Sequence, residues 1–202
     1  MKIGVLGYQG DVEEHISTIN SMSGPKRKVS GIRITKRSEL DMCDGLIIPG
    51  GESTTIYKLI IEYGLYDYIK EKAVNGFPVM GTCAGLIIIS AETGDDRVRG
   101  MGIIDISIVR NAYGRQIDSF IKTIDIKGIG NFPAVFIRAP VIQSPGSADV
   151  LAYEGEKPVI VRKENVLGMT FHPELTGKTN IHEYFMHMIE GERYTSTGNL
   201  SR

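Results

Sequence analysis

Short apolar runs alternate with helical patterns through the first half of the chain, and this rhythm restricts the possible folds more than any other feature. Each run has the length of a strand, and each is followed by a segment in which apolar residues recur every three or four positions. The expected strands are 3–6, 29–34, 46–48 and 78–80, and the expected helices are 12–19, 56–63, 65–74 and a segment from 86 onward. Short strands that are apolar on both faces are typical of a parallel sheet covered by helices on each side.

The second half of the chain is dominated by extended patterns. Apolar and polar residues alternate over 104–108, and residues 163–165 connect two strand-like runs as a hairpin would. A final helix is expected over 181–188. We therefore predict an α/β fold with three layers, α/β/α, in which a central, mostly parallel mixed sheet has an antiparallel extension. One domain is expected over 1–191, followed by a polar tail over 192–202 that frays.

Composition argues against several classes of partner. The chain has 23 basic and 24 acidic residues, a net charge of −1, so no positive excess exists to attract nucleic acid or an anionic membrane. Its first residues lack a signal-peptide pattern, and no stretch approaches the roughly 18 apolar residues of a membrane-spanning helix. Its two cysteines do not make the framework of a secreted disulfide scaffold. We expect a soluble protein of a reducing, cytoplasmic compartment, with neither nucleic acid nor membrane as a partner.

Residues 81–85, Gly-Thr-Cys-Ala-Gly, lie between an expected strand and an expected helix and have the form of a nucleophile elbow. Such a turn holds its central residue in a strained backbone conformation at a helix N-terminus, which favours a thiolate at Cys83. It also makes the N–H of Ala84 available as a donor to an oxyanion. The alternative is a buried, inert cysteine beside a glycine turn. Cys43 has no such turn, and we expect it to be structural.

A cysteine nucleophile needs a base and a group that orients the base. His172 ends an apolar run and is followed by Pro173 and Glu174. In an extended chain, residues two apart project to the same side, so we expect the carboxylate to lie behind the imidazole. The alternative for this triplet is a simple exit from a strand. The other three histidines lie in predicted helices, where a surface or packing role is expected.

Two glycines follow the strand at 46–48, in the segment Pro-Gly-Gly-Glu-Ser at 49–53. They permit close approach of the backbone, so Gly51 could supply a second oxyanion donor. The alternative is the start of a helix capped by Ser53 or Thr54. Asp11, with Glu14 three residues on, is likewise expected to cap the first helix. The glycines fit neither a dinucleotide nor a Walker pattern, and no cysteine–histidine spacing indicates a metal site.

At these residues the chain resembles the class I (triad) glutamine amidotransferases, and most closely the glutaminase subunits of pyridoxal 5′-phosphate synthase. The matching segments extend from residue 2 to about residue 188. They are 4–10 (GVLGYQG), 49–55 (PGGESTT), 81–87 (GTCAGLI), 110–111 (RN), 114–120 (GRQIDSF), 136–140 (FIRAP) and 171–176 (FHPELT). The segments at 114–120 and 136–140 are not general amidotransferase features, so the narrower resemblance is specific.

The resemblance implies that Cys83 attacks the side-chain amide of L-glutamine, that His172 serves as base and then acid, and that Glu174 orients it. It implies a glutamyl thioester, no cofactor, and passage of ammonia to a separate (β/α)₈-barrel synthase that makes the vitamin B6 cofactor. It also implies that docking activates the glutaminase. The turn at 7–11, including Gln9, is expected at that contact. The implied glutamine pocket consists of Gly51, Glu52, Ser53, Arg110, Ile137 and Arg138.

Three alternatives stay open. A cysteine hydrolase of the elbow-bearing peptidase or chaperone type would place its acid and histidine differently. A non-enzymatic regulatory subunit would be free to lose a member of the triad. The amidotransferase subunit of histidine biosynthesis would lack the segments at 110–111, 114–120 and 136–140. The chain departs from the pattern of its closest resemblance in the polar link at 21–31 and the compact connection at 94–97, both peripheral.

Overall fold

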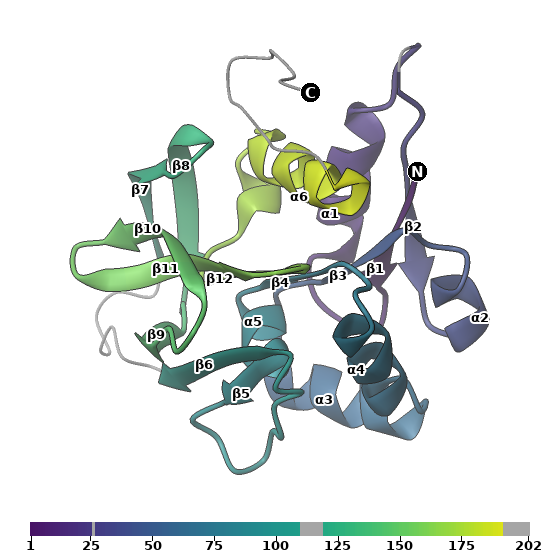
Figure 1. Ribbon diagram of the computed structural model, residues 1–202, viewed down its shortest axis with the longest axis horizontal. Helices are drawn as coiled ribbons and strands as arrows, with labels where there is room; N and C mark the ends of the chain where they lie inside the picture. The colour runs from purple at the N-terminus through teal and green to yellow at the C-terminus, as the bar shows by residue number, and fades with distance from the viewer. Residues whose placement is uncertain (26, 110–118, 192–202) are drawn as a thin grey trace.

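The computed structural model describes residues 1–25, 27–109 and 119–191, and it has a seven-stranded sheet at its centre (Figure 1). The strands of this sheet are β1 (Lys2–Leu6), β2 (Ser30–Ile34), β3 (Gly45–Ile48), β4 (Val79–Thr82), β10 (Asp149–Glu154), β11 (Lys157–Lys163) and β12 (Val166–Met169). Their order is β10-β11-β12-β4-β3-β1-β2. The strands from β12 to β2 are parallel, whereas β11 and β10 continue the sheet in antiparallel pairing.

Helices cover both faces of the sheet, so the predicted three-layer α/β/α fold is confirmed. One face carries α1 (Val12–Ser21) and α6 (Asn180–Glu190), and the other carries α3 (Ser53–Glu62), α4 (Tyr66–Val74) and α5 (Ala84–Ile89) (Figure 1). Successive residues of a strand contribute to opposite cores. Within β3, Ile47 joins the core beneath α1 and α6, and its neighbours Leu46 and Ile48 join the core beneath α3 to α5. This is why the strands are apolar without alternation.

Two smaller sheets flank one end of the central sheet. The first contains β5 (Ser90–Glu92), β6 (Ile104–Val109) and β9 (Val141–Ser144). The second is the hairpin of β7 (Ser119–Ile126) and β8 (Gly130–Ile137). The rings of Phe120 and Phe136 stack across this hairpin with centroids 4.7 Å apart. Phe136 then contacts Phe171 beside the end of β12, which fixes the end of β8 close to the central strands.

Some elements lie outside the sequence predictions. The helix α2 (Arg37–Leu40) has four residues and β5 has three, too few for a hydrophobic period to be recognisable. In β10, the register shifts between Val150 and Ala152 and again before Tyr153, which disrupts the expected alternation. The strand β9 is also missing from the prediction. The tail at 192–202 lies outside the described residues.

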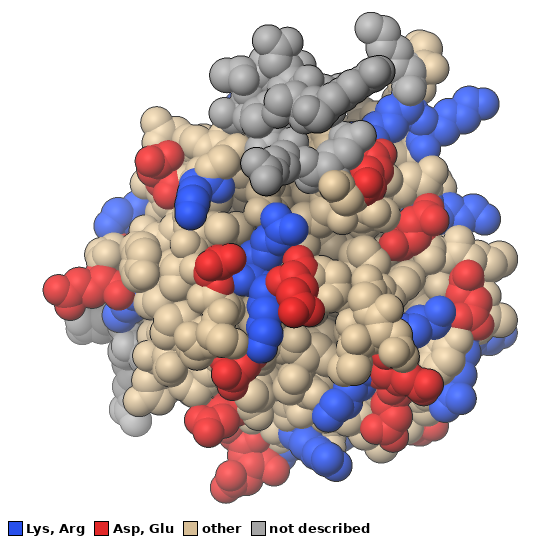
Figure 2. Space-filling model, viewed as in Figure 1, with Lys and Arg blue, Asp and Glu red and all other residues tan. Residues whose placement is uncertain are grey.

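The surface carries charges of both signs. On the face drawn in Figure 2, acidic (red) and basic (blue) side chains are interspersed with each other, in keeping with the near-zero net charge. Among the described residues, no helix is both long enough and apolar enough to cross a bilayer.

The topology brings four separated segments to one edge of the sheet. Because β12, β4, β3 and β1 are neighbours and parallel, their carboxyl ends meet. The segments that follow these four ends are 170–174, 83–85, 49–53 and 7–11. Ligands of open α/β sheets bind outside the carboxyl ends of the strands. The three segments singled out for chemistry, and the turn at 7–11, therefore lie together.

Candidate active site

The turn from β4 into α5 has the strained geometry predicted for a nucleophile elbow. Cys83 adopts φ 48° and ψ −102°, a conformation that residues other than glycine rarely take. Close packing explains the flanking glycines. A Cβ on Gly85 would lie 1.9 Å from the carbonyl oxygen of Ile48, and a Cβ on Gly81 would lie 2.8 Å from the carbonyl of Gly85. Larger residues at these two positions would displace α5 from the sheet.

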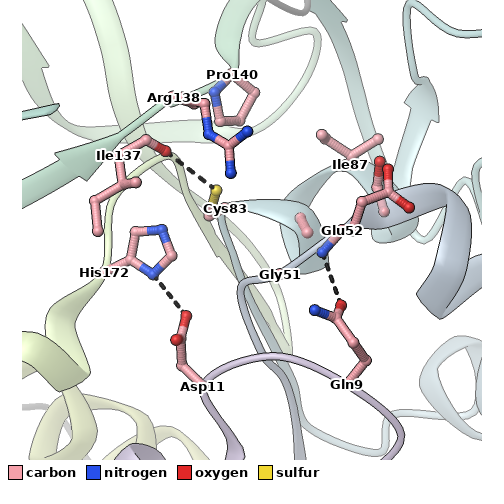
Figure 3. Close-up of a pocket in the computed structure, with 12 residues that line it drawn as sticks. Gln9, Asp11, Gly51, Glu52, Cys83, Ile87, Ile137, Arg138, Pro140 and His172 are labelled. Carbon is pink, nitrogen blue, oxygen red and sulfur yellow. Dashed lines mark hydrogen bonds and ion pairs between the residues drawn. The ribbon is translucent and has the colours of Figure 1, made fainter. Parts of the chain in front are cut away.

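His172 lies beside the elbow at the end of the neighbouring strand. Its backbone N–H donates to the carbonyl of Val135 in β8 at 2.8 Å, which anchors it between the central sheet and the hairpin. One ring nitrogen, Nδ1, lies 2.9 Å from Oε1 of Glu174. The other, Nε2, is buried, forms no standard hydrogen bond with a described residue, and faces the sulfur of Cys83 (Figure 3). The imidazole of His172 thus lies between the sulfur of Cys83 and the carboxylate of Glu174.

From the sequence, the pairing of His172 with Glu174 is explained by an extended backbone, and that explanation is wrong. His172 itself is extended, at φ −108° and ψ 90°, but Pro173–Leu175 form a short 3₁₀ helix, η1. Glu174 therefore reaches the imidazole from a helical turn and not from a straight strand. Proline suits the first position of such a turn because its φ is already fixed and it has no N–H to satisfy.

A second carboxylate contacts the same ring nitrogen. Oδ2 of Asp11 lies 3.1 Å from Nδ1 of His172 (Figure 3). Asp11 was expected to cap α1, and it does occupy the N-cap position, but its side chain makes no capping hydrogen bond. The expected capping bond is missing. From the sequence alone, an aspartate that caps a helix cannot be told from one that contacts an imidazole. Only the neighbouring strand ends reveal which role applies.

These contacts favour the charged imidazole. Burial opposes charge on the ring, but the carboxylates of Asp11 and Glu174 and the sulfur of Cys83 outweigh it and raise the pKa of His172 to about 12. The hydrogen bond with His172 is the main reason why the pKa of Asp11 is lowered. Burial, in contrast, raises the pKa of Glu174 although His172 opposes that effect. The arrangement favours the imidazolium form of His172 in the resting site.

The glycine loop after β3 interlocks with the turn at 7–11. Gly51 has φ 148°, and a Cβ there would lie 2.5 Å from Oε1 of Gln9. That same oxygen accepts a hydrogen bond from the backbone N–H of Glu52 at 2.8 Å. The N–H of Asp11 donates to the carbonyl of Gly50 at 3.2 Å. The turn therefore holds the loop whose Gly51 N–H is the expected oxyanion donor.

Glu52, and not Ser53 or Thr54, caps α3. Its carboxylate accepts hydrogen bonds from the backbone N–H groups of Thr54 and Thr55. Burial opposes ionisation, but the hydroxyls and N–H groups of these two threonines lower the pKa of Glu52 to about 2. Glu52 is therefore an anion that also lines the cavity described next.

A cavity of about 370 Å³ opens above the elbow, a volume in the usual range for small-molecule sites. Its lining includes every candidate residue from the sequence except Glu174, which lies behind His172, and Arg110, which lies outside the described residues. The lining residues are Gln9, Asp11, Gly51, Glu52, Ser53, Cys83, Ala84, Ile87, Ile137, Arg138, Pro140 and His172. The sequence predictions missed Asp11, Ile87 and Pro140.

A model described as the SNO glutamine amidotransferase family matches residues 5–191, a span that contains the elbow, the glycine loop and the His-Pro-Glu triplet. The chain belongs to this family. A relative from Thermoplasma acidophilum, named pyridoxal 5′-phosphate synthase subunit PdxT, is 56% identical over 100% of both chains. One of the same name from Thermoplasma volcanium is 58% identical over 98% of each. A solved structure described as a glutamine amidotransferase is 38% identical, with a TM-score of 0.86 over 93% of this chain and 98% of that one.

The second cysteine of this amidotransferase has a different environment. Cys43 lies in the core beneath α3 to α5, and its thiol contacts the carbonyl of Glu39 at 3.3 Å. Burial raises the pKa of Cys43 to about 11, which keeps the thiol protonated and unreactive at neutral pH. These contacts favour the structural role expected for it.

Among the described residues, Asp11, His172 and Glu174 each have one potential metal-ligand atom, and these three atoms lie within 4.8 Å of one another. Nδ1 of His172 already lies 3.1 Å from Oδ2 of Asp11 and 2.9 Å from Oε1 of Glu174. A proton on that nitrogen accounts for both short distances. These contacts account for the grouping of the three side chains.

Behind Glu174 lies a pair of fully buried imidazoles. Nε2 of His15 is 3.4 Å from Oε2 of Glu174 and 3.3 Å from the hydroxyl of Thr82, and Nδ1 of His15 is 2.9 Å from Nε2 of His182. The hydrogen-bond partners of His15 are the Thr82 hydroxyl and the imidazole of His182. Oε2 of Glu174 lies near His15 but forms no hydrogen bond with a described residue. The sequence predicts a surface or packing role for both histidines, and nothing in it indicates the contact between His15 and Glu174.

Both imidazoles are neutral at pH 7, which predicts loss of stability in mild acid. Burial lowers the pKa of His182 to about 4 and that of His15 well below its ordinary value. The unfolded chain binds protons at these sites below about pH 6.5, so the free energy of unfolding falls as the pH drops from there toward 4. We expect His182 alone to contribute about 2 kcal/mol less at pH 5 than at pH 7.5.

Urea unfolding at the two pH values measures this difference. In His182→Gln, whose amide can keep the contact with His15 but does not titrate, the difference should shrink by that amount. An unchanged pH dependence in this variant would show that His182 is not the acid-sensitive group.

Proposed function

We propose that this chain is the glutaminase subunit of a pyridoxal 5′-phosphate synthase, hydrolysing L-glutamine to glutamate and ammonia for a partner synthase. The observation that carries the proposal is full-length similarity, at 56% and 58% identity, to two proteins that bear that synthase's subunit name. The family match and the elbow geometry support the hydrolytic chemistry.

In the first half of the proposed reaction, the thiolate of Cys83 attacks the side-chain carbonyl carbon of glutamine. The carbonyl oxygen becomes an oxyanion, for which the N–H groups of Gly51 and Ala84 are the proposed donors. His172, protonated at Nε2, gives its proton to the amide nitrogen. The carbon–nitrogen bond breaks, ammonia leaves, and a glutamyl thioester remains on Cys83.

In the second half, water attacks the thioester and His172, now neutral, accepts a proton from it. The carbon–sulfur bond breaks, glutamate is released, and the thiolate–imidazolium pair forms again. Glu174 orients the ring throughout through its contact with Nδ1, 2.9 Å away. This chemistry needs no redox step and no cofactor.

The cavity supports recognition of the amino-acid end of the substrate. We assign Glu52, an anion that faces the cavity, to the α-ammonium group, and Arg138 to the α-carboxylate. Arg138 lines the same cavity and makes no ion pair with any described residue. Arg110 is assigned to this end by the family resemblance alone. Ser53 is 2% exposed, and its hydroxyl has no hydrogen-bond partner among the described residues. The hydroxyl is therefore available to a ligand. Ile137 also lines the cavity.

The partner in this proposal is a (β/α)₈-barrel synthase subunit, and Gln9 is part of the surface that contacts it. Gln9 supports this assignment because it bonds to the loop that carries Gly51. A contact that moves Gln9 would alter the position of an oxyanion donor, which links docking to activity.

The test compares two nitrogen sources. A purified barrel synthase with its phosphosugar substrates should form pyridoxal 5′-phosphate from ammonium salt without this chain. It should form the product from glutamine only when this chain is added, and ammonia release from glutamine should rise at least about tenfold on mixing. Glutaminase activity without transfer to the synthase would leave the amidotransferase assignment standing and contradict the narrower one.

A further inference from the structure

We propose that Asp11 is a positioning residue of the glutaminase reaction, a second carboxylate that holds His172 through the same Nδ1–H as Glu174. The inference rests on the proposed function, because it concerns the base of that reaction. Nothing in the triad itself requires a second acid. From the sequence, Asp11 is expected to cap α1 and, as part of the turn at 7–11, to lie near the partner contact.

The contact is built into the packing of the site. Oδ2 of Asp11 is 3.1 Å from Nδ1 of His172, and Gly50 lies against both groups. A Cβ on Gly50 would lie 2.4 Å from Cε1 of the imidazole and 2.9 Å from the carboxylate of Asp11. The backbone N–H of Asp11 is bound to the carbonyl of Gly50. The absence of a side chain at residue 50 is what lets the carboxylate and the ring meet.

The two carboxylates approach the ring from different elements and different environments. Glu174 comes from η1 and its side chain is fully buried, whereas the side chain of Asp11 is 30% exposed at the rim of the cavity. Burial raises the pKa of Glu174, while that of Asp11 is lowered. Asp11 also stands at the N-terminus of the ten-residue helix α1, where the helix dipole favours an anion. Asp11 is thus the more firmly ionised partner of the imidazolium.

This arrangement has a defined effect on the reaction. His172 is charged while the thiolate waits for substrate and neutral after it has protonated the leaving ammonia. A second anion at Nδ1 stabilises the charged state and so increases the fraction of Cys83 present as thiolate. A role in capping α1 predicts none of this, and the side chain of Asp11 makes no capping bond whose loss would weaken the helix.

The test measures the pH dependence of Cys83 alkylation by iodoacetamide. The background is Cys43→Ser, so that one thiol reacts. Asp11→Asn keeps the side-chain shape and removes the charge. We expect its alkylation midpoint to move upward by about one pH unit, because the imidazolium is less stabilised. The matched control is Glu14→Gln, which removes an exposed acid from the same first turn of α1 and should leave the midpoint unchanged.

Steady-state kinetics with saturating synthase subunit complete the test. In Asp11→Asn, kcat should fall about tenfold with KM changed less than twofold and the thermal midpoint of unfolding unchanged. An unshifted alkylation profile, or an equal shift in Glu14→Gln, would overturn the proposal. So would a loss expressed only in KM, which would make Asp11 a substrate contact. The alkylation result needs no glutamine and no partner, so it stands or fails separately from the proposed function.

Discussion

Replacement of Cys83 by alanine is expected to reduce ammonia release from glutamine by at least about four orders of magnitude while the fold stays intact. The loss follows because no other described group combines a nucleophile with the imidazole of His172, and removal of a nucleophile typically eliminates most of an enzyme's rate enhancement. The fold should survive because alanine is smaller than cysteine in a turn that is tightly packed on both sides. We expect the free energy of unfolding to change by less than about 1 kcal/mol.

The measurement is ammonia release in the presence of the synthase subunit, with urea unfolding in parallel. Cys43→Ser is the matched control, because it removes the other thiol from a site remote from the cavity. It should retain nearly full turnover. Substantial turnover by Cys83→Ala would remove Cys83 from the mechanism, and loss of activity in a folded Cys43→Ser variant would contradict its structural role.

The parts of the site that could be predicted from sequence are those encoded by a short, continuous segment. The elbow is an example: strand, Gly-Thr-Cys-Ala-Gly and helix occur within a few residues. Gly81 is required by a contact within the turn, with Gly85, although Gly85 itself is required by the neighbouring strand β3. The main strands are another, since burial on both faces leaves an unmistakable apolar run. The same holds for the pairing of His172 with Glu174, although the backbone between them is a 3₁₀ turn and not a strand.

The parts that could not be predicted depend on which segments become neighbours. Asp11 and His172 are 161 positions apart, and they meet because β1 and β12 both lie beside the β3–β4 pair with the same direction. His15 reaches Glu174 for a similar reason, from the face of α1 that packs toward η1. Both residues had adequate local explanations, as a helix cap and as a packed histidine. A satisfactory local role can therefore hide a functional one.

Removal of the imidazole should affect both activity and stability. In His172→Leu, ammonia release is expected to fall by at least about 10⁴, because no other described group near the sulfur can accept its proton and return it to the leaving ammonia. The same change leaves the buried carboxylate of Glu174 without its main partner. An unpaired buried charge destabilises strongly, so we expect the free energy of unfolding at pH 7.5 to fall by about 3 kcal/mol, measured by urea unfolding.

A second substitution separates the two effects. In His172→Leu/Glu174→Gln, the buried group is neutral, so most of the lost stability should return while activity stays absent. The side chain of Asp11, 30% exposed, should contribute little to the loss, because solvent can hydrate its carboxylate. If the double variant is no more stable than His172→Leu, the instability comes from lost packing around the ring and not from an uncompensated charge. The ion pair at the centre of the site would then be weaker than its geometry indicates.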